Sequence, residues 1–136
     1  MKIAKQIVVA EGALLNSSTV SVLETDAVRL WTDLQSPPSE VFLEATIMVI
    51  KAGGSNNYAD LYRILANGNS AGSPIDSVTV QQIFHWDVRI ADNTYGGVVT
   101  AVTMDIDSGL LRVRVTGSGS ATGFTATTWL KAWANG

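Results

Sequence analysis

Apolar and polar residues alternate along most of this chain, and a period of two is typical of β-strands that bury one side. In residues 40–51 one side of the alternation carries only aliphatic residues, beginning with Val41 and Leu43. The other side mixes acidic residues with Phe42 and Met48, which predicts a strand covered on both faces. The same alternation predicts eight strands, at residues 3–10, 19–24, 27–34, 40–51, 78–90, 98–106, 110–116 and 124–134.

Turn-forming residues separate these strands. Asp107, Ser108 and Gly109 predict a tight hairpin between the strands that flank them, and Gln81 with Gln82 indicates a bulge where the alternation shifts phase. Short strands punctuated in this way predict an all-β fold, an antiparallel β-sandwich of jelly-roll type with about eight strands and little or no helix. Residues 57–66 fit both a helical stripe and a strand. In an all-β chain we favour the strand, and the helix stays open.

Length and composition limit the classes of function. With 136 residues the chain has the size of one domain, and we expect residues 1–136 to form a single sandwich. Nine basic and twelve acidic residues give a net charge of −3, and because the basic residues are scattered we expect no nucleic-acid binding. The longest largely apolar run, residues 45–50, is far too short to cross a membrane. Charged residues make up only 15% of the chain, which indicates that partner proteins cover some apolar surface.

Candidates for catalysis or cofactor binding are few. The chain has one histidine, His85, which we interpret as a polar contact, and it has no cysteine. Asp105 and Asp107 could together hold Ca²⁺, but the spacing of a calcium loop is absent and a solvated hairpin turn explains them better. We therefore expect no enzyme activity, no cofactor and no metal site. A depolymerase with two converging carboxylates is the weakest alternative that stays open.

Aromatic residues are the better functional candidates, because an exposed indole or phenol can stack on a sugar ring beside polar neighbours. The candidates for partner contact or glycan binding are Trp129, Trp133, Lys131, Tyr58, Tyr62 and Tyr95. The same aromatic residue types are enriched in subunit interfaces, and for Trp129 and Trp133 we favour an interface or the core.

The C-terminal quarter combines a D-S-G turn at 107–109, the strand L-R-V-R-V-T-G at 111–117, a loop of small residues and the strand T-T-W-L-K-A-W at 127–133. This combination resembles the C-terminal β-sandwich modules of bacteriophage virion proteins, namely capsid decoration knobs and tail-fibre tips. The resemblance implies a trimer about a threefold axis. We expect residues 1–10 to be a first strand or an N-terminal arm that contacts a neighbouring subunit, with Lys2, Ile3, Lys5 and Ile7 as contact residues.

Together these expectations predict a non-enzymatic structural protein of the virion. The function that we favour is a trimeric capsid decoration (cement) protein that stabilises the head. Its expected partners are itself, as a homotrimer, and the major capsid protein or another virion protein. The alternative is a receptor-binding tail-fibre tip that recognises a host-surface polysaccharide. The sequence leaves open the choice between head and tail, the host and the glycan.

Overall fold

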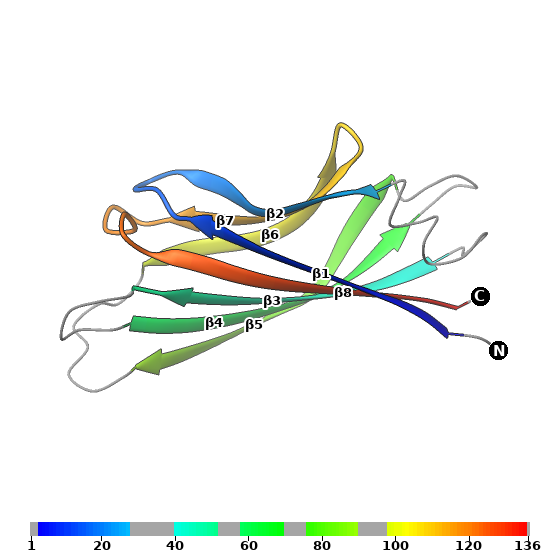
Figure 1. Cartoon of the computed structure of the whole chain (residues 1–136), viewed down its shortest axis with the longest axis horizontal. Coiled ribbons are helices and arrows are strands. Elements are labelled where there is room, and N and C mark those ends of the chain that lie inside the picture. The colour runs from blue at the N-terminus through cyan, green and yellow to red at the C-terminus, as the bar shows by residue number, and fades with distance from the viewer. Residues whose placement is uncertain (1–2, 28–39, 52–57, 70–75, 90–97, 136) are drawn as a thin grey trace.

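The computed structural model describes residues 3–27, 40–51, 58–69, 76–89 and 98–135. Within these ranges the chain forms eight strands and almost no helix (Figure 1). The strands are β1 (Ile3–Ala13), β2 (Thr19–Asp26), β3 (Glu40–Ile50), β4 (Tyr58–Asn69), β5 (Ser77–Arg89), β6 (Val99–Asp107), β7 (Leu110–Gly117) and β8 (Thr125–Asn135). The strand predicted at 27–34 lies outside the described residues, apart from Ala27. Among the described residues, no helix has the length and apolar character needed to span a membrane.

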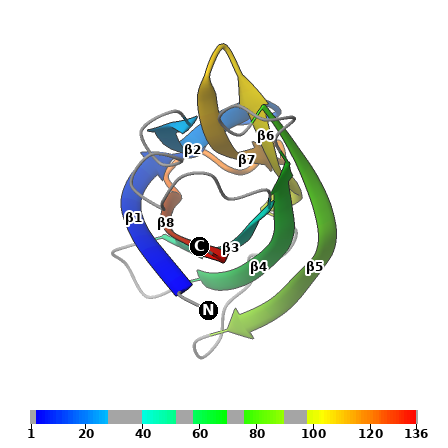
Figure 2. The same ribbon diagram turned by 90° about the vertical axis from the view of Figure 1, so that its right-hand side faces the viewer.

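The strands pair antiparallel in two sheets that face each other. The larger sheet has the order β1-β8-β3-β4-β5, and the smaller sheet has the order β2-β7-β6. In Figure 2 the larger sheet curves around the interior and the smaller sheet lies across its open side. The predicted antiparallel sandwich is therefore confirmed. The neighbours β1-β8-β3 and β2-β7 are those of a jelly roll, whereas β3, β4 and β5 follow one another along the chain as a meander.

The aliphatic side chains at the inward positions of the strands fill the interior of the sandwich. In β3 every second side chain from Val41 to Val49 is almost fully buried, and β7 and β8 contribute in the same way. The largest fully buried side chains include Phe124, Leu14, Leu23, Leu43, Ile47, Ile64, Leu111 and Leu130. Burial of one such side chain contributes about 1.5 to 3 kcal/mol, so the inner faces alone can hold the two sheets together.

The segment that fits both a helix and a strand in sequence is β4, which pairs with β3 on one side and β5 on the other. Tyr62, Ile64 and Ala66 point to the inner side, and the residues between them point outward. Pairing on both sides satisfies the backbone hydrogen bonds of the segment, which outweighs the helical spacing of its apolar residues. The register of β4 and β5 shifts beside Gln81, which confirms the predicted bulge.

The two ends of the described chain lie side by side in the larger sheet. β1 pairs with β8 over its full length, beginning with Ile3 opposite Asn135, and β8 lies between β1 and β3. Residues 3–10 therefore belong to an edge strand that pairs within its own chain.

The hairpin between β6 and β7 turns as its residues predict. Ser108 and Gly109 both have positive φ, at 50° and 78°, and Asp107 pairs with Leu110 across the turn. This is the backbone of a tight two-residue hairpin, in which glycine adopts positive φ without steric cost.

Candidate functional site

The outward side of the larger sheet gathers large apolar side chains from all five strands. Residues that pair across neighbouring antiparallel strands point to the same side of a sheet, so the register places these side chains together. We call this surface the apolar face; its main residues are Ile7 and Val9 of β1, Trp129, Lys131 and Trp133 of β8, Phe42, Glu44, Thr46, Met48 and Ile50 of β3, Leu61, Arg63 and Leu65 of β4, and Phe84 and Trp86 of β5. The register also places the polar residues Glu11, Asn67, Gln82, Thr125 and Thr127 on this side.

Several side chains of the apolar face are widely exposed. Val9 is 57% exposed, Phe42 53%, Ile7 52% and Trp86 43%. Single exposed apolar residues are normal on protein surfaces, whereas a contiguous apolar patch marks a contact surface. The strands that are apolar on both sides in the sequence are the ones that build this patch.

Aromatic rings are concentrated in two parts of the apolar face. In one part, Trp133 of β8 stands opposite Phe42 of β3, and Trp129 lies further along the same strand. In the other part, the rings of Phe84 and Trp86 on β5 are stacked with their centroids 5.8 Å apart. Aromatic clusters of this kind are typical of the buried centre of protein interfaces.

The charged residues of the apolar face balance one another. The guanidinium carbon of Arg63 lies 5.9 Å from the centre of the Trp86 ring, and its Nε lies 3.8 Å from Oε1 of Glu44. Lys131 stands opposite Glu44 in the register of β3 and β8. Because these charges alternate in sign, the face lacks the basic field that would attract nucleic acid or an anionic membrane.

The outward side of the smaller sheet has the opposite composition. We call it the polar face; it consists of Thr19, Ser21, Glu24 and Asp26 of β2, Leu110, Arg112, Arg114 and Thr116 of β7, and Ala101, Thr103, Asp105 and Asp107 of β6. Leu110, beside the hairpin turn, is the one large apolar residue in this set. A face of this composition is typical of an antiparallel sheet that meets water.

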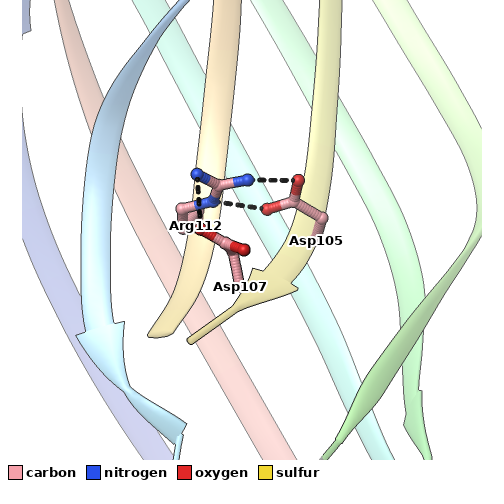
Figure 3. A network of polar contacts seen from close by, with 3 residues as sticks. All are labelled: Asp105, Asp107 and Arg112. Atoms are coloured by element: carbon pink, nitrogen blue, oxygen red, sulfur yellow. Dashed lines mark hydrogen bonds and ion pairs between the residues drawn. The ribbon is translucent and has the colours of Figure 1, made fainter. Parts of the chain in front are cut away.

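Arg112 organises the polar face near the hairpin. Its Nε and Nη2 each donate a hydrogen bond of 2.8 Å to Asp105, and its Nη1 lies 3.4 Å from Oδ2 of Asp107 (Figure 3). The hydrogen bond from Arg112 lowers the pKa of Asp105, and the same bond raises the pKa of Arg112. Both carboxylates considered for Ca²⁺ therefore face a guanidinium. Within the described residues, no group of three or more acidic or histidine side chains could hold a metal ion.

A separate polar cluster lies on the inner side of β4 and β5. Nε2 of His85 is hydrogen-bonded to Oδ1 of Asp60, and the His85 ring stacks on Tyr62 with centroids 4.3 Å apart. The Asp60 side chain is 1% exposed, whereas that of His85 is 47% exposed. A buried carboxylate without a partner is costly, so His85 acts as the structural partner of Asp60.

The predicted residues of β8 lie together with those of β1. Trp129, Lys131 and Trp133 are half-buried on the apolar face, and Ile7 stands opposite Lys131. Lys5 stands opposite Trp133 along the backbone. The structure therefore joins Ile7, one of the predicted N-terminal contact residues, with the C-terminal tryptophans in one surface.

Tyr62, the one predicted tyrosine whose side chain the structure describes, does not join this surface. Tyr62 is buried on the inner side beside Asp60, so these two residues do not form the exposed aromatic and acidic patch expected for a glycan. Tyr58 is the first residue of β4, but its side chain lies outside the described part of the structure, as do Lys2 and Tyr95 entirely.

The sequence alone does not reveal that β4 and β5 complete the apolar face. Leu61, Leu65, Phe84 and Trp86 alternate with inward residues, which is visible in the sequence. Their position beside β3 and β8 depends on the order of strands in the sheet, about which alternation carries no information.

Comparison with known proteins gives a likeness of fold. No family model matches the chain, and no curated protein sequence matches it. The tailspike protein of Acinetobacter baumannii phage AM24 matches 97% of this chain with a TM-score of 0.54 and 12% sequence identity. The tailspike protein of Acinetobacter phage vB_ApiP_P1 matches 96% of it with a TM-score of 0.47 and 11% identity. The chain spans 26% of the first tailspike and 22% of the second.

Proposed function

We propose that the chain is a non-enzymatic β-sandwich module of a bacteriophage tail, and that it acts as a homotrimer within a tailspike or tail fibre. The observation that carries the proposal is the apolar face, which extends over all five strands of a sheet whose central strands β8, β3 and β4 are already packed on their inner side. Such a surface is stabilised when another molecule removes it from water. The fold shared with part of a phage tailspike supports a module within a larger tail assembly.

The tail is favoured over the capsid surface. The sequence alone favours capsid decoration, because a short sandwich with apolar outer positions suits a knob on a capsid lattice. Both functions require a β-sandwich that buries an outer surface against other virion proteins. The segment with the same fold belongs to a tail protein, which moves our proposal to the tail and leaves the capsid as the alternative.

The tryptophans of β8 are assigned to assembly rather than to glycan binding. In the register of the sheet Trp133 is flanked by Phe42 and Lys5, and Trp129 is flanked by Val9 and Thr46. A sugar needs several convergent hydrogen-bond partners for its hydroxyl groups in addition to an aromatic ring. The largely apolar surroundings favour contact with protein, so recognition of a polysaccharide requires a different surface.

Three carboxylates, those of Asp60, Asp105 and Asp107, support a structural role. A depolymerase needs two carboxyl groups that flank a glycosidic bond. Asp105 and Asp107 face Arg112, and Asp60 is buried and bonded to His85. These acids stabilise the fold at the positions where they lie.

Immunolabelling of phage particles that contain the chain tests its location. We expect an antibody against the chain, viewed by electron microscopy, to label tail spikes or fibres. Label on the head would reject the tail proposal in favour of capsid decoration. Incubation of the purified chain with host-surface polysaccharide tests the non-enzymatic role: the polymer length should stay unchanged, and cleavage would reject that role.

A further inference from the structure

The identity of the molecule that covers the apolar face follows from the size, charge and curvature of that face. We propose that the occupant is a second copy of this chain, and that unlike halves of the face meet. The β1–β8 half carries Ile7, Val9, Trp129 and Trp133, and the β4–β5 half carries Leu61, Leu65, Phe84 and Trp86. That the assembly contains three copies rests on the proposed function. The assignment of the apolar face as the contact surface, and the pairing of its unlike halves, do not depend on that function.

The area of the apolar face is that of a protein interface. Five strands spaced about 4.8 Å apart, each with roughly ten residues at about 3.3 Å per residue, span about 800 Å². A standard interface takes about 800 Å² from each partner. In a ring each copy divides this area between two neighbours, about 400 Å² per contact, so a single contact is smaller than a standard interface and only the closed ring buries the whole face.

The charges on the apolar face are compatible with contact between two copies of this chain. Arg63 and Lys131 are matched by Glu44 and by Glu11 at the border of the face, so two copies meet without net repulsion. A partner selected by charge, such as nucleic acid, an anionic membrane or an acidic polysaccharide, would require an excess of one sign. The composition therefore favours a neutral protein surface of the same kind.

The curvature of the larger sheet decides which parts of two copies meet. In Figure 2 the sheet wraps around the core, so its β1–β8 half and its β4–β5 half face different directions. A twofold contact of one half with itself would leave the other half uncovered. A cyclic arrangement, in which the β1–β8 half of one copy packs on the β4–β5 half of the next, covers both halves and closes into a ring.

Glutamate substitutions at exposed positions can block each half separately without touching the core. The first variant carries Ile7→Glu and Val9→Glu, and the second carries Trp86→Glu. The control carries Thr103→Glu, which places the same charge at an exposed strand position on the polar face. The mass of each protein is measured by sedimentation over a dilution series, and circular dichroism shows whether the fold is kept. Val9→Ser or Trp86→Ser replaces any glutamate variant that loses its fold.

We expect the wild type and the control to have three times the 14.4 kDa mass of the chain. Each blocked variant alone should be a folded monomer whose association is at least about 30-fold weaker, the size of effect that a single interface hot spot produces. Mixed in equal amounts at the highest concentration of the series, the two variants should form a pair with one copy of each, held more weakly than the wild-type ring because it has a single contact. In that pair the intact β4–β5 half of the first variant meets the intact β1–β8 half of the second.

Three results would overturn the inference. A blocked variant that dimerises with itself would show that like halves meet. A trimer that neither variant disturbs would show that a different surface is used. A wild-type monomer, including one that binds only another virion protein, would reject the second copy as occupant. The immunolabelling experiment decides the location separately. If the antibody labels the head and the chain is a trimer held by the apolar face, only the proposed tail function is rejected. If the antibody labels the tail and the chain is a monomer, only the present inference is rejected.

Discussion

The two sheets of this sandwich bury similar inner faces and present opposite outer faces. On the polar face, Arg112 contacts both Asp105 and Asp107 of the neighbouring strand, and all three side chains are in reach of water (Figure 3). On the apolar face, the outward positions hold residues such as Phe42 and Trp86, which remain widely exposed in the single chain. Both sheets follow the same alternation, and the core requires only the inward residues. The difference between the faces is the one expected if the polar face meets water and, as we propose, the apolar face meets protein.

This comparison separates the free energy of unfolding of one chain from the free energy of association between chains along each strand of the larger sheet. Inward residues should determine the free energy of unfolding of one chain, and outward residues should determine how chains associate. Neighbouring residues of one strand can thus be compared directly, because they share the backbone and differ in the side of the sheet to which they point.

The largest expected effect is on the inner side of β3, where Ile47 is fully buried. Ile47→Ala should lower the free energy of unfolding by about 2 to 5 kcal/mol, because it removes buried methyl groups and leaves a cavity. Its neighbour Met48 points outward, so Met48→Ala should change the stability of the dilute chain by about 1 kcal/mol or less while weakening association. Urea unfolding and sedimentation of the two variants measure these effects. Equal losses of stability at both positions would contradict the division between the two sides.

The next effect concerns the buried acid of β4. His85→Ala should lower the free energy of unfolding by about 1 to 3 kcal/mol, because Asp60 stays buried and loses its hydrogen-bond partner. The neighbouring substitution Trp86→Ala, on the apolar face of the same strand, should cost the single chain much less although tryptophan is the larger residue. Urea unfolding at neutral pH compares them, and His85→Gln, which keeps an N–H group, should recover part of the loss. A greater loss for Trp86→Ala would show that the apolar face stabilises the single chain.

Local features of this fold follow from the sequence because they depend on neighbours along the chain. The alternation in residues 40–51 identifies the buried side of β3, Ser108 and Gly109 predict the hairpin, and Gln81 marks the bulge. The pairing of distant strands does not follow in this way, since alternation has the same period in every strand. The contact between Asp60 and His85 and the row formed by the β8 tryptophans with Phe42 depend on strand order, and only the structure shows them.

A smaller effect is expected at Thr128, a fully buried residue on the inner side of β8. Its hydroxyl oxygen has no hydrogen-bond partner among the described residues. Thr128→Val should raise the free energy of unfolding by about 1 kcal/mol, because the substitution removes a buried polar group without changing the shape of the side chain much. Thr127→Val, on the outward side of the same strand, is the matched control and should stay within about 0.5 kcal/mol of the wild type. Loss of stability in Thr128→Val, measured by urea unfolding, would show that the hydroxyl is bonded.

The smallest effect belongs to the polar face and appears in acid. Folding lowers the pKa of Asp105 through its hydrogen bond with Arg112, from an ordinary value of about 4. A carboxylate of this kind stabilises the fold at pH values above its unfolded pKa, and the contribution is lost as the pH falls through the folded pKa. The effect is small because the Asp105 side chain is 40% exposed and water screens the pair.

Asp105→Asn should therefore have a slightly lower thermal midpoint than the wild type at neutral pH, and the difference should shrink steadily below about pH 4 as the wild-type carboxylate gains its proton. Calorimetry between neutral and acid pH measures the two curves. Met48→Ala provides the comparison from the apolar face, because its difference from the wild type involves no titrating group and should not shrink over the same pH range. An Asp105→Asn difference that persists unchanged in acid would contradict the role of charge. It would mean that the hairpin depends on the second hydrogen bond that Asp105 accepts from Arg112, because asparagine has nearly the same shape but only one acceptor oxygen.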